Sequence, residues 1–131
     1  KNFHLVGHFK RNFGTLLYML RARFPDAKLI WTPIPTLRVC PALPKRLGEV
    51  LAARADLINA MGVRMCHARG ATATTPVGAV DATCFARAGF HPNGKGYRVW
   101  AEHIAPWFET PEPTDKSKPQ PAQITQLARR A

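Results

Sequence analysis

His91 is the residue of this sequence whose type and surroundings best suit acid–base chemistry. Pro92 and Asn93 follow it, and a helical pattern begins directly after them. Asn caps helix N-termini well, because its side chain accepts a hydrogen bond from the first free backbone N–H groups. A general base must reach a nucleophile within hydrogen-bond distance, and a capped helix start holds a histidine in a fixed place. The alternative is that a single histidine beside an aromatic helix is a packed or surface residue.

Two other residue pairs, one of two histidines and one of a cysteine and a histidine, could bind a metal, but neither forms a full ligand set. His4 and His8 are spaced to share one helical face, yet no third ligand is placed near them. A solvated polar face is the favoured interpretation of that pair. Cys66 and His67 are adjacent and are interpreted as the end of a strand. The sequence therefore predicts no metal site and no cofactor.

The three cysteines indicate a reducing environment. Cys40, Cys66 and Cys84 are odd in number and widely spaced, so they form no disulfide framework and no CxxC pair. We expect reduced, buried thiols in an intracellular compartment, with an organelle left open. No signal peptide and no apolar run of transmembrane length is visible. The first residue is Lys1 rather than Met, and we expect a segment upstream of it.

The pattern of apolar residues predicts the elements that must position His91. Helices are expected over residues 3–24, 44–61 and 93–105. Short apolar runs predict strands at residues 28–32, where a helix is the weaker alternative, and at 63–66. Residues 69–80 are expected to form a loop. The alternation of helix and strand predicts parallel strands, side by side and flanked by helices, in an α/β fold.

Each predicted helix has a face of large apolar residues that we expect to be buried. The first helix would bury Leu5, Phe9, Phe13, Leu16, Leu17, Leu20 and Phe24. The second would bury Leu47, Val50, Leu51, Leu57, Ile58 and Met61, with Gly62 ending the helix. The third would bury Tyr97, Trp100, Ala101, Ile104 and Phe108.

The end of the chain differs in composition from the rest. Residues 109–131 contain alternating prolines and charged residues, which predict an extended, solvated tail after a folded body at residues 1–108. The net charge of the chain is +11, and its isoelectric point is near 10.5. The tail holds nearly equal numbers of acidic and basic residues, so the body carries almost all of this positive charge.

One continuous stretch resembles a known family. It reads Phe85-Ala-Arg-Ala-Gly-Phe-His-Pro-Asn-Gly-Lys-Gly-Tyr-Arg-Val-Trp-Ala-Glu-His-Ile-Ala-Pro106. It resembles the last conserved block of the SGNH hydrolases, also called GDSL esterases and lipases. There, an Asp-x-x-His-Pro-x-x-x-Gly-Tyr-x-x-Trp-Ala pattern delivers the catalytic base. The residues that match are His91, Pro92, Gly96, Tyr97, Trp100 and Ala101.

The resemblance covers roughly residues 9–108 and implies both a fold and a role. It implies the C-terminal part of a flavodoxin-like, three-layer SGNH hydrolase fold, with His91 as the general base. The block departs from the family at Ala88, where the family has the Asp that orients the imidazole. Asp81, seven residues before His91, could replace that Asp only through a rearranged loop.

The family's other catalytic parts have no match in these 131 residues. No Gly-Asp-Ser block and no Gly-x-Asn-Asp block are present, and the single serine, Ser117, lies in the predicted tail. The sequence therefore predicts an ester hydrolase module that lacks its N-terminal nucleophile half and is inactive by itself. Whether it is an enzyme stays open.

The charge leads to an alternative function. A large positive charge favours phosphate-rich partners, because neutralising phosphates releases counterions. The chain would then be a catalytically dead, SGNH-like structural subunit of a larger assembly, such as one that contains RNA, as in an organellar ribosome. No RNA-binding motif with interleaved aromatic residues is present, and another anionic surface would suit the same charges. With only two strands, we expect a partner in either case, the missing N-terminal half or another protein chain.

Overall fold

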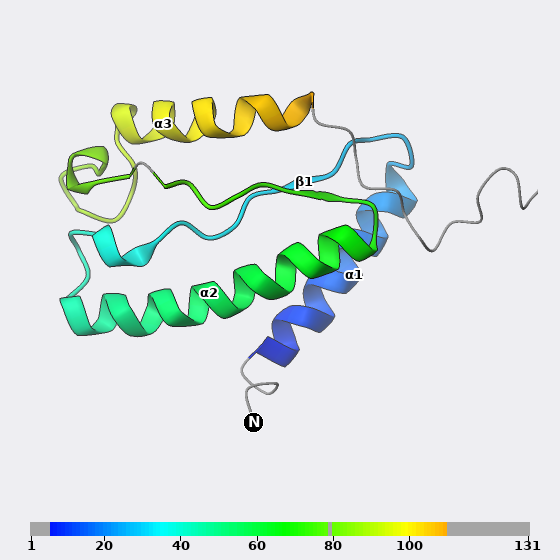
Figure 1. Ribbon diagram of the computed structural model, residues 1–131, viewed down its shortest axis with the longest axis horizontal. Coiled ribbons are helices and arrows are strands. Elements are labelled where there is room, and N and C mark those ends of the chain that lie inside the picture. The colour runs from blue at the N-terminus through cyan, green and yellow to red at the C-terminus, as the bar shows by residue number, and fades with distance from the viewer. Residues whose placement is uncertain (1–5, 79, 110–131) are drawn as a thin grey trace, which may run out of the picture.

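The computed structural model describes residues 6–78 and 80–109, and Figure 1 shows their arrangement. Three α-helices dominate it: α1 (Gly7–Arg23), α2 (Lys45–Ala68) and α3 (Gly94–Ile104). All three predicted helices are therefore present. The predicted start of the first helix, before residue 6, and the predicted tail beyond residue 109 lie outside the described residues.

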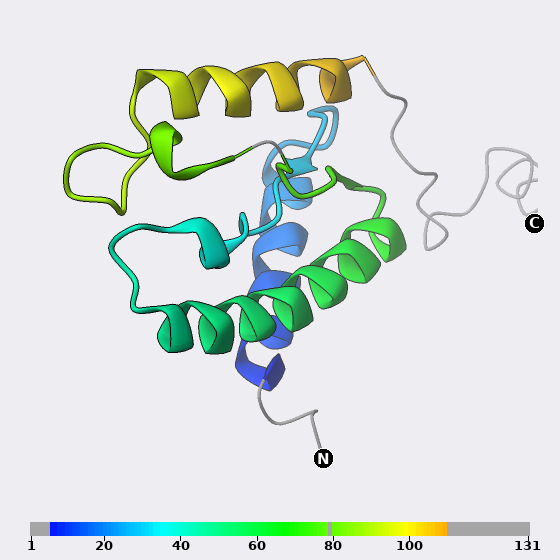
Figure 2. The same ribbon diagram turned by 60° about the vertical axis from the view of Figure 1, so that its left-hand side comes forward.

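The sheet consists of two short strands. β1 (Ile30–Trp31) pairs in parallel with β2 (Thr72–Ala73), with Ile30 opposite Thr72 and Trp31 opposite Ala73. In Figures 1 and 2, α3 lies on one side of the segments that carry these strands, and α2 lies on the other side. The described part of the chain is thus a mostly helical α/β unit with a small parallel sheet. Its two strands do not by themselves make the sheet of a three-layer fold.

The prediction of a strand at residues 63–66 is wrong, because these residues lie in the last turns of α2. Gly62 does not end the helix. It lies buried in the middle of α2, where a Cβ would come within 2.3 Å of the indole ring of Trp31. The glycine therefore lets Trp31 pack directly on the helix. The second strand instead lies in the predicted loop at residues 69–80, where the N–H of Thr72 donates to the carbonyl of Leu29 at 2.8 Å.

The predicted buried faces are only partly correct. In α1, Phe13 and Leu17 are buried, whereas Leu16 and Phe24, which directly follows the helix, are about half exposed. Six residues of the other two predicted helices were also expected to be buried but are exposed. They are Leu47, Val50 and Leu57 of α2, and Tyr97, Ala101 and Phe108 in and after α3.

Small residues explain the error in α2. The buried side of this helix contains Gly48, Ala52, Ala55 and Gly62, so the segment that precedes the helix packs close to its backbone. The larger apolar residues of α2 therefore lie beside the contact between the helix and the preceding segment, and do not take part in it. Among the described residues, several large apolar side chains are left facing solvent as a result.

The main hydrophobic core lies between α1, the end of α2 and the strands. It contains Phe13, Leu17, Met65, Cys66 and Ala71. The ring of Phe13 lies 5.0 Å from that of Phe9 and 5.3 Å from that of Trp31, as measured between centroids. None of the described helices is long and apolar enough to span a bilayer.

A buried amide on α2 fixes the chain that follows β1. Asn59 is 8 % exposed, and its Oδ1 accepts a hydrogen bond of 2.9 Å from the N–H of Ile34. Its Nδ2 donates to the carbonyl of the same residue at 2.8 Å. Asn59 thus satisfies both backbone groups of Ile34, much as a neighbouring strand would. This contact sets the position of Pro35, the next residue along.

Candidate functional site

His91 lies on a short loop whose backbone is tied on both sides. The N–H of Ala86 donates to the carbonyl of His91 at 2.8 Å, and the N–H of Asn93 donates to the carbonyl of Cys84 at 2.9 Å. Phe85 and Pro92 face each other as an isolated antiparallel bridge. These contacts form a narrow hairpin-like turn that presents His91 close to the start of α3.

Asn93 caps α3, as predicted. Its Oδ1 accepts a hydrogen bond of 3.0 Å from the N–H of Gly96. Its Nδ2 donates to the carbonyls of Thr83 and Phe85, at 2.8 and 2.9 Å. One side chain therefore joins the helix start to the turn that carries His91. The cap itself was predictable from the sequence, but these two further bonds were not.

Two glycines allow the close contacts of this loop. Gly89 has a φ of +72°, a backbone conformation that glycine adopts without strain. Its carbonyl accepts hydrogen bonds from the N–H of Ala42 and from the Sγ of Cys40, both at 3.1 Å. At Gly96, a Cβ would lie 2.2 Å from the carbonyl oxygen of Cys84. The His91 loop is thus held against residues 40–42 on one side and against α3 on the other.

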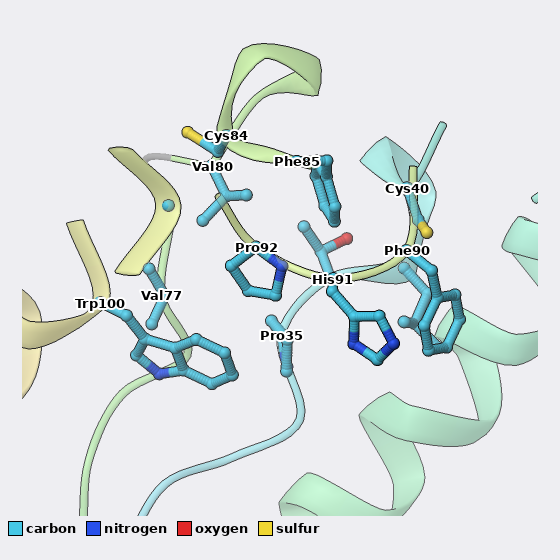
Figure 3. Close-up of a pocket in the computed structure, with 13 residues that line it drawn as sticks. Pro35, Cys40, Val77, Val80, Cys84, Phe85, Phe90, His91, Pro92 and Trp100 are labelled. Carbon is cyan, nitrogen blue, oxygen red and sulfur yellow. The ribbon is translucent and has the colours of Figure 1, made fainter. Parts of the chain in front are cut away.

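An apolar pocket of about 270 Å³ lies beside His91. Its walls come from three separated parts of the chain: residues 35–40, the segment from Phe90 to Trp100, and a stretch between them that contributes Val77, Val80, Cys84 and Phe85. Figure 3 shows His91, Pro92, Pro35 and Trp100 around this space. The volume is well above the ~150 Å³ that accommodates a benzene molecule in an engineered protein cavity. A small apolar group would therefore fit next to the imidazole.

Trp100 lines the pocket and has a buried hydrogen-bond donor that the sequence did not reveal. Its Nε1 is buried and has no hydrogen-bond partner among the described residues. Tryptophan N–H groups normally find a partner when they are buried. The match to the family block identified Trp100 by type only. Its unused donor is a property of the folded chain.

No carboxylate orients the imidazole of His91 within the described part of the chain. Ala88 lies in the turn before His91 and offers only a methyl group. The Oδ1 of Asp81 accepts from the N–H of Thr83 at 2.8 Å, and Oδ2 lies 3.7 Å from the Nζ of Lys95. Hydrogen bonds from Thr83 hold the pKa of Asp81 below its usual value. Asp81 therefore stabilises the turn before α3 and does not serve His91 in this arrangement.

The other predicted candidates lie away from this pocket. His4 is outside the described residues, and His8 is exposed on α1, where its Nδ1 lies 3.4 Å from a guanidinium nitrogen of Arg11. Cys66 and His67 belong to the last turns of α2, and not to a strand end. Within residues 6–78 and 80–109, no group of three His, Cys, Asp or Glu side chains could hold a metal ion.

The three thiols are free and buried, as expected. Burial raises the pKa of Cys66 to about 11, so this thiol is neutral at physiological pH.

His103 was not singled out in the sequence, yet its Nε2 lies 2.7 Å from the carbonyl of Thr75. His103 thus joins α3 to the segment that enters the pocket wall at Val77.

Comparisons with protein-family models, with curated proteins and with solved structures found no match to this chain. The resemblance to the SGNH hydrolases therefore depends on the sequence block around His91 alone.

Proposed function

We propose that this chain is a module of an SGNH-type ester hydrolase, in which His91 is the general base and which is inactive by itself. The observation that carries the proposal is the position of His91, on a tied loop beside an apolar pocket and close to the capped start of α3. The small parallel sheet with helices on both sides is compatible with part of a three-layer α/β fold.

The chemistry requires a serine from another polypeptide segment. His91 would take the proton of that serine hydroxyl as the serine attacks an ester carbonyl, and would then return the proton to the leaving alcohol. The pocket would hold the apolar part of the ester. Because no carboxylate pairs with the imidazole among the described residues, His91 and the serine would act as a dyad without a third member.

Ala88 supports the alternative function, a catalytically dead structural subunit of a larger assembly. Replacing the orienting Asp in a serine hydrolase costs several orders of magnitude in rate, so its absence indicates weak selection for hydrolysis. In that case the pocket and loop are retained for folding, and the positive charge of the body serves binding to an anionic partner.

Complementation tests the proposal. The chain would be mixed with, or fused to, an N-terminal esterase segment that carries the Gly-Asp-Ser and Gly-x-Asn-Asp blocks. We expect no hydrolysis of p-nitrophenyl acetate by the chain alone, and measurable turnover with the added segment. His91→Ala should abolish that turnover, whereas His67→Ala, at an exposed histidine on α2, should leave it intact. Turnover that survives His91→Ala, or no turnover in any combination, would favour the structural subunit.

A further inference from the structure

A second hollow lies on the surface of α1, and its chemistry differs from that of the pocket at His91. Its side chains include Lys10, Arg11, Thr15 and Tyr18 from α1 and Arg69 from the end of α2. It shares no lining residue with the pocket at His91. Three of its residues are cationic, two carry hydroxyl groups, and no acidic residue lines it.

The positive charge of this hollow is not neutralised within the described part of the chain. Lys10, Arg11 and Arg69 are all exposed, and none forms an ion pair with a described residue. Arg38, by contrast, is paired with both Glu49 and Asp56. Like charges that converge without counter-charges repel one another, so an anion in the hollow would relieve that repulsion.

A glycine of α1 lies where Arg69 meets this helix. Gly14 lies in the middle of α1, where a Cβ would come within 3.4 Å of the Nη2 of Arg69 and 3.3 Å of the Cε of Met65. The guanidinium of Arg69 thus lies against the surface of α1 at Gly14. As a result, the cation that follows α2 joins the two cations of α1 on one surface.

Tyr18 gives the hollow an exposed aromatic face. The residue is 73 % exposed, and no hydrogen bond or ring contact to another described residue holds it. Aromatic side chains beside a cationic groove are the recurring combination in proteins that bind single-stranded nucleic acids, because bases stack on the ring while the cations track the phosphates.

We propose that this hollow binds single-stranded nucleic acid, with phosphates at Lys10, Arg11 and Arg69 and a base stacked on Tyr18. The hollow is open and most of its residues are exposed, which suits an extended polyanion better than a small enclosed ligand. An acidic peptide would match the charges but would gain little from Tyr18. The inference does not depend on hydrolase activity at His91.

A matched pair of charge reversals tests the cations. Lys10-Arg11 and Lys45-Arg46 are both exposed Lys-Arg pairs on helices, and only the first lines the hollow. K10E/R11E and K45E/R46E change the net charge equally. Fluorescence anisotropy with a labelled 12-nucleotide oligouridine would measure affinity from 50 to 200 mM salt. We expect K10E/R11E to weaken binding about tenfold or more and to reduce the magnitude of the slope of log K against log salt by about 1.4, because two phosphate contacts are lost. K45E/R46E should cost less than about threefold.

Tyr18 variants and a peptide competitor test the nature of the ligand. Tyr18→Phe should retain the affinity, whereas Tyr18→Ala should lower it about fivefold or more, because only the ring can stack on a base. Oligoglutamate of equal charge should displace the RNA poorly. The proposal is overturned if the two double variants weaken binding equally, if Phe and Ala at position 18 behave alike, or if oligoglutamate competes as well as RNA. Circular dichroism of each variant would confirm that the helices are retained.

Discussion

The imidazole of His91 stands edge-on to the ring of Phe90, with centroids 5.5 Å apart and planes at 87°. This aromatic contact is the one ring contact of His91 among the described residues, and no carboxylate takes the place of the family's Asp. The loop therefore fixes the backbone of His91 through hydrogen bonds, while the orientation of its ring depends on packing alone.

Restoring the missing carboxylate should therefore improve the dyad. In the complemented enzyme, we expect Ala88→Asp to raise kcat for p-nitrophenyl acetate by about tenfold or more, because an Asp at this position would orient the imidazole and stabilise its charged form. Ala88→Asn is the matched control, since it adds similar volume without a charge. If the two variants have the same kcat, position 88 does not act on His91 through charge.

The contact between Gly96 and Cys84 predicts a sharp difference between two glycines of α3. Gly96→Ala should lower the free energy of unfolding by about 2 kcal/mol, because its Cβ would overlap the carbonyl oxygen of Cys84. Gly94→Ala is the control, because a Cβ there meets nothing within 4 Å. This second change should be neutral or stabilising by about 0.5 kcal/mol. Urea denaturation measures both, and equal effects would contradict the observed approach of α3 to Cys84.

Asn59 should contribute to the stability of the fold by holding the segment between β1 and α2 in place. Asn59→Leu keeps the size of the side chain but leaves both backbone groups of Ile34 without their partner. We expect a loss of about 2 kcal/mol in the free energy of unfolding. Asn12→Leu, on the exposed surface of α1, should change it by less than about 0.5 kcal/mol. A loss below that value for Asn59→Leu would show that water replaces the amide.

Cys66 should make the protein sensitive to high pH. Its pKa is raised from 9.0 to about 11 by burial, so the unfolded chain loses this proton at a lower pH than the folded one. The stabilising contribution is full below pH 9 and is lost as the pH rises towards 11. Thermal unfolding between pH 7 and 11 should therefore show a smaller alkaline decrease in Tm for Cys66→Ala than for the wild type. Parallel decreases in the two proteins would exclude Cys66 as the cause.

Local patterns in the sequence determined part of this structure. The presence of three helices, the Asn93 cap and the position of His91 close to the start of α3 follow from short-range signals, because capping and proline turns depend on neighbouring residues. The positively charged body and the buried thiols follow from composition. The α1 cations Lys10 and Arg11 are neighbours in the sequence, but nothing in the sequence places Arg69 beside them.

Only the tertiary structure decided how the elements meet. The residues around Gly62 are the same whether this glycine ends a helix or makes room for Trp31 inside one. The packing of the indole ring, which comes from a distant part of the sequence, decides between these two structures. β2 is a strand because Thr72 and Thr74 pair with the backbone of residues 29–31, some forty residues earlier in the chain. The wall of the pocket at His91 likewise joins residues 35–40 to Val77, Val80, Cys84 and Phe85. Contacts between residues so far apart in the sequence leave no periodic pattern, since each depends on the packing of the whole chain.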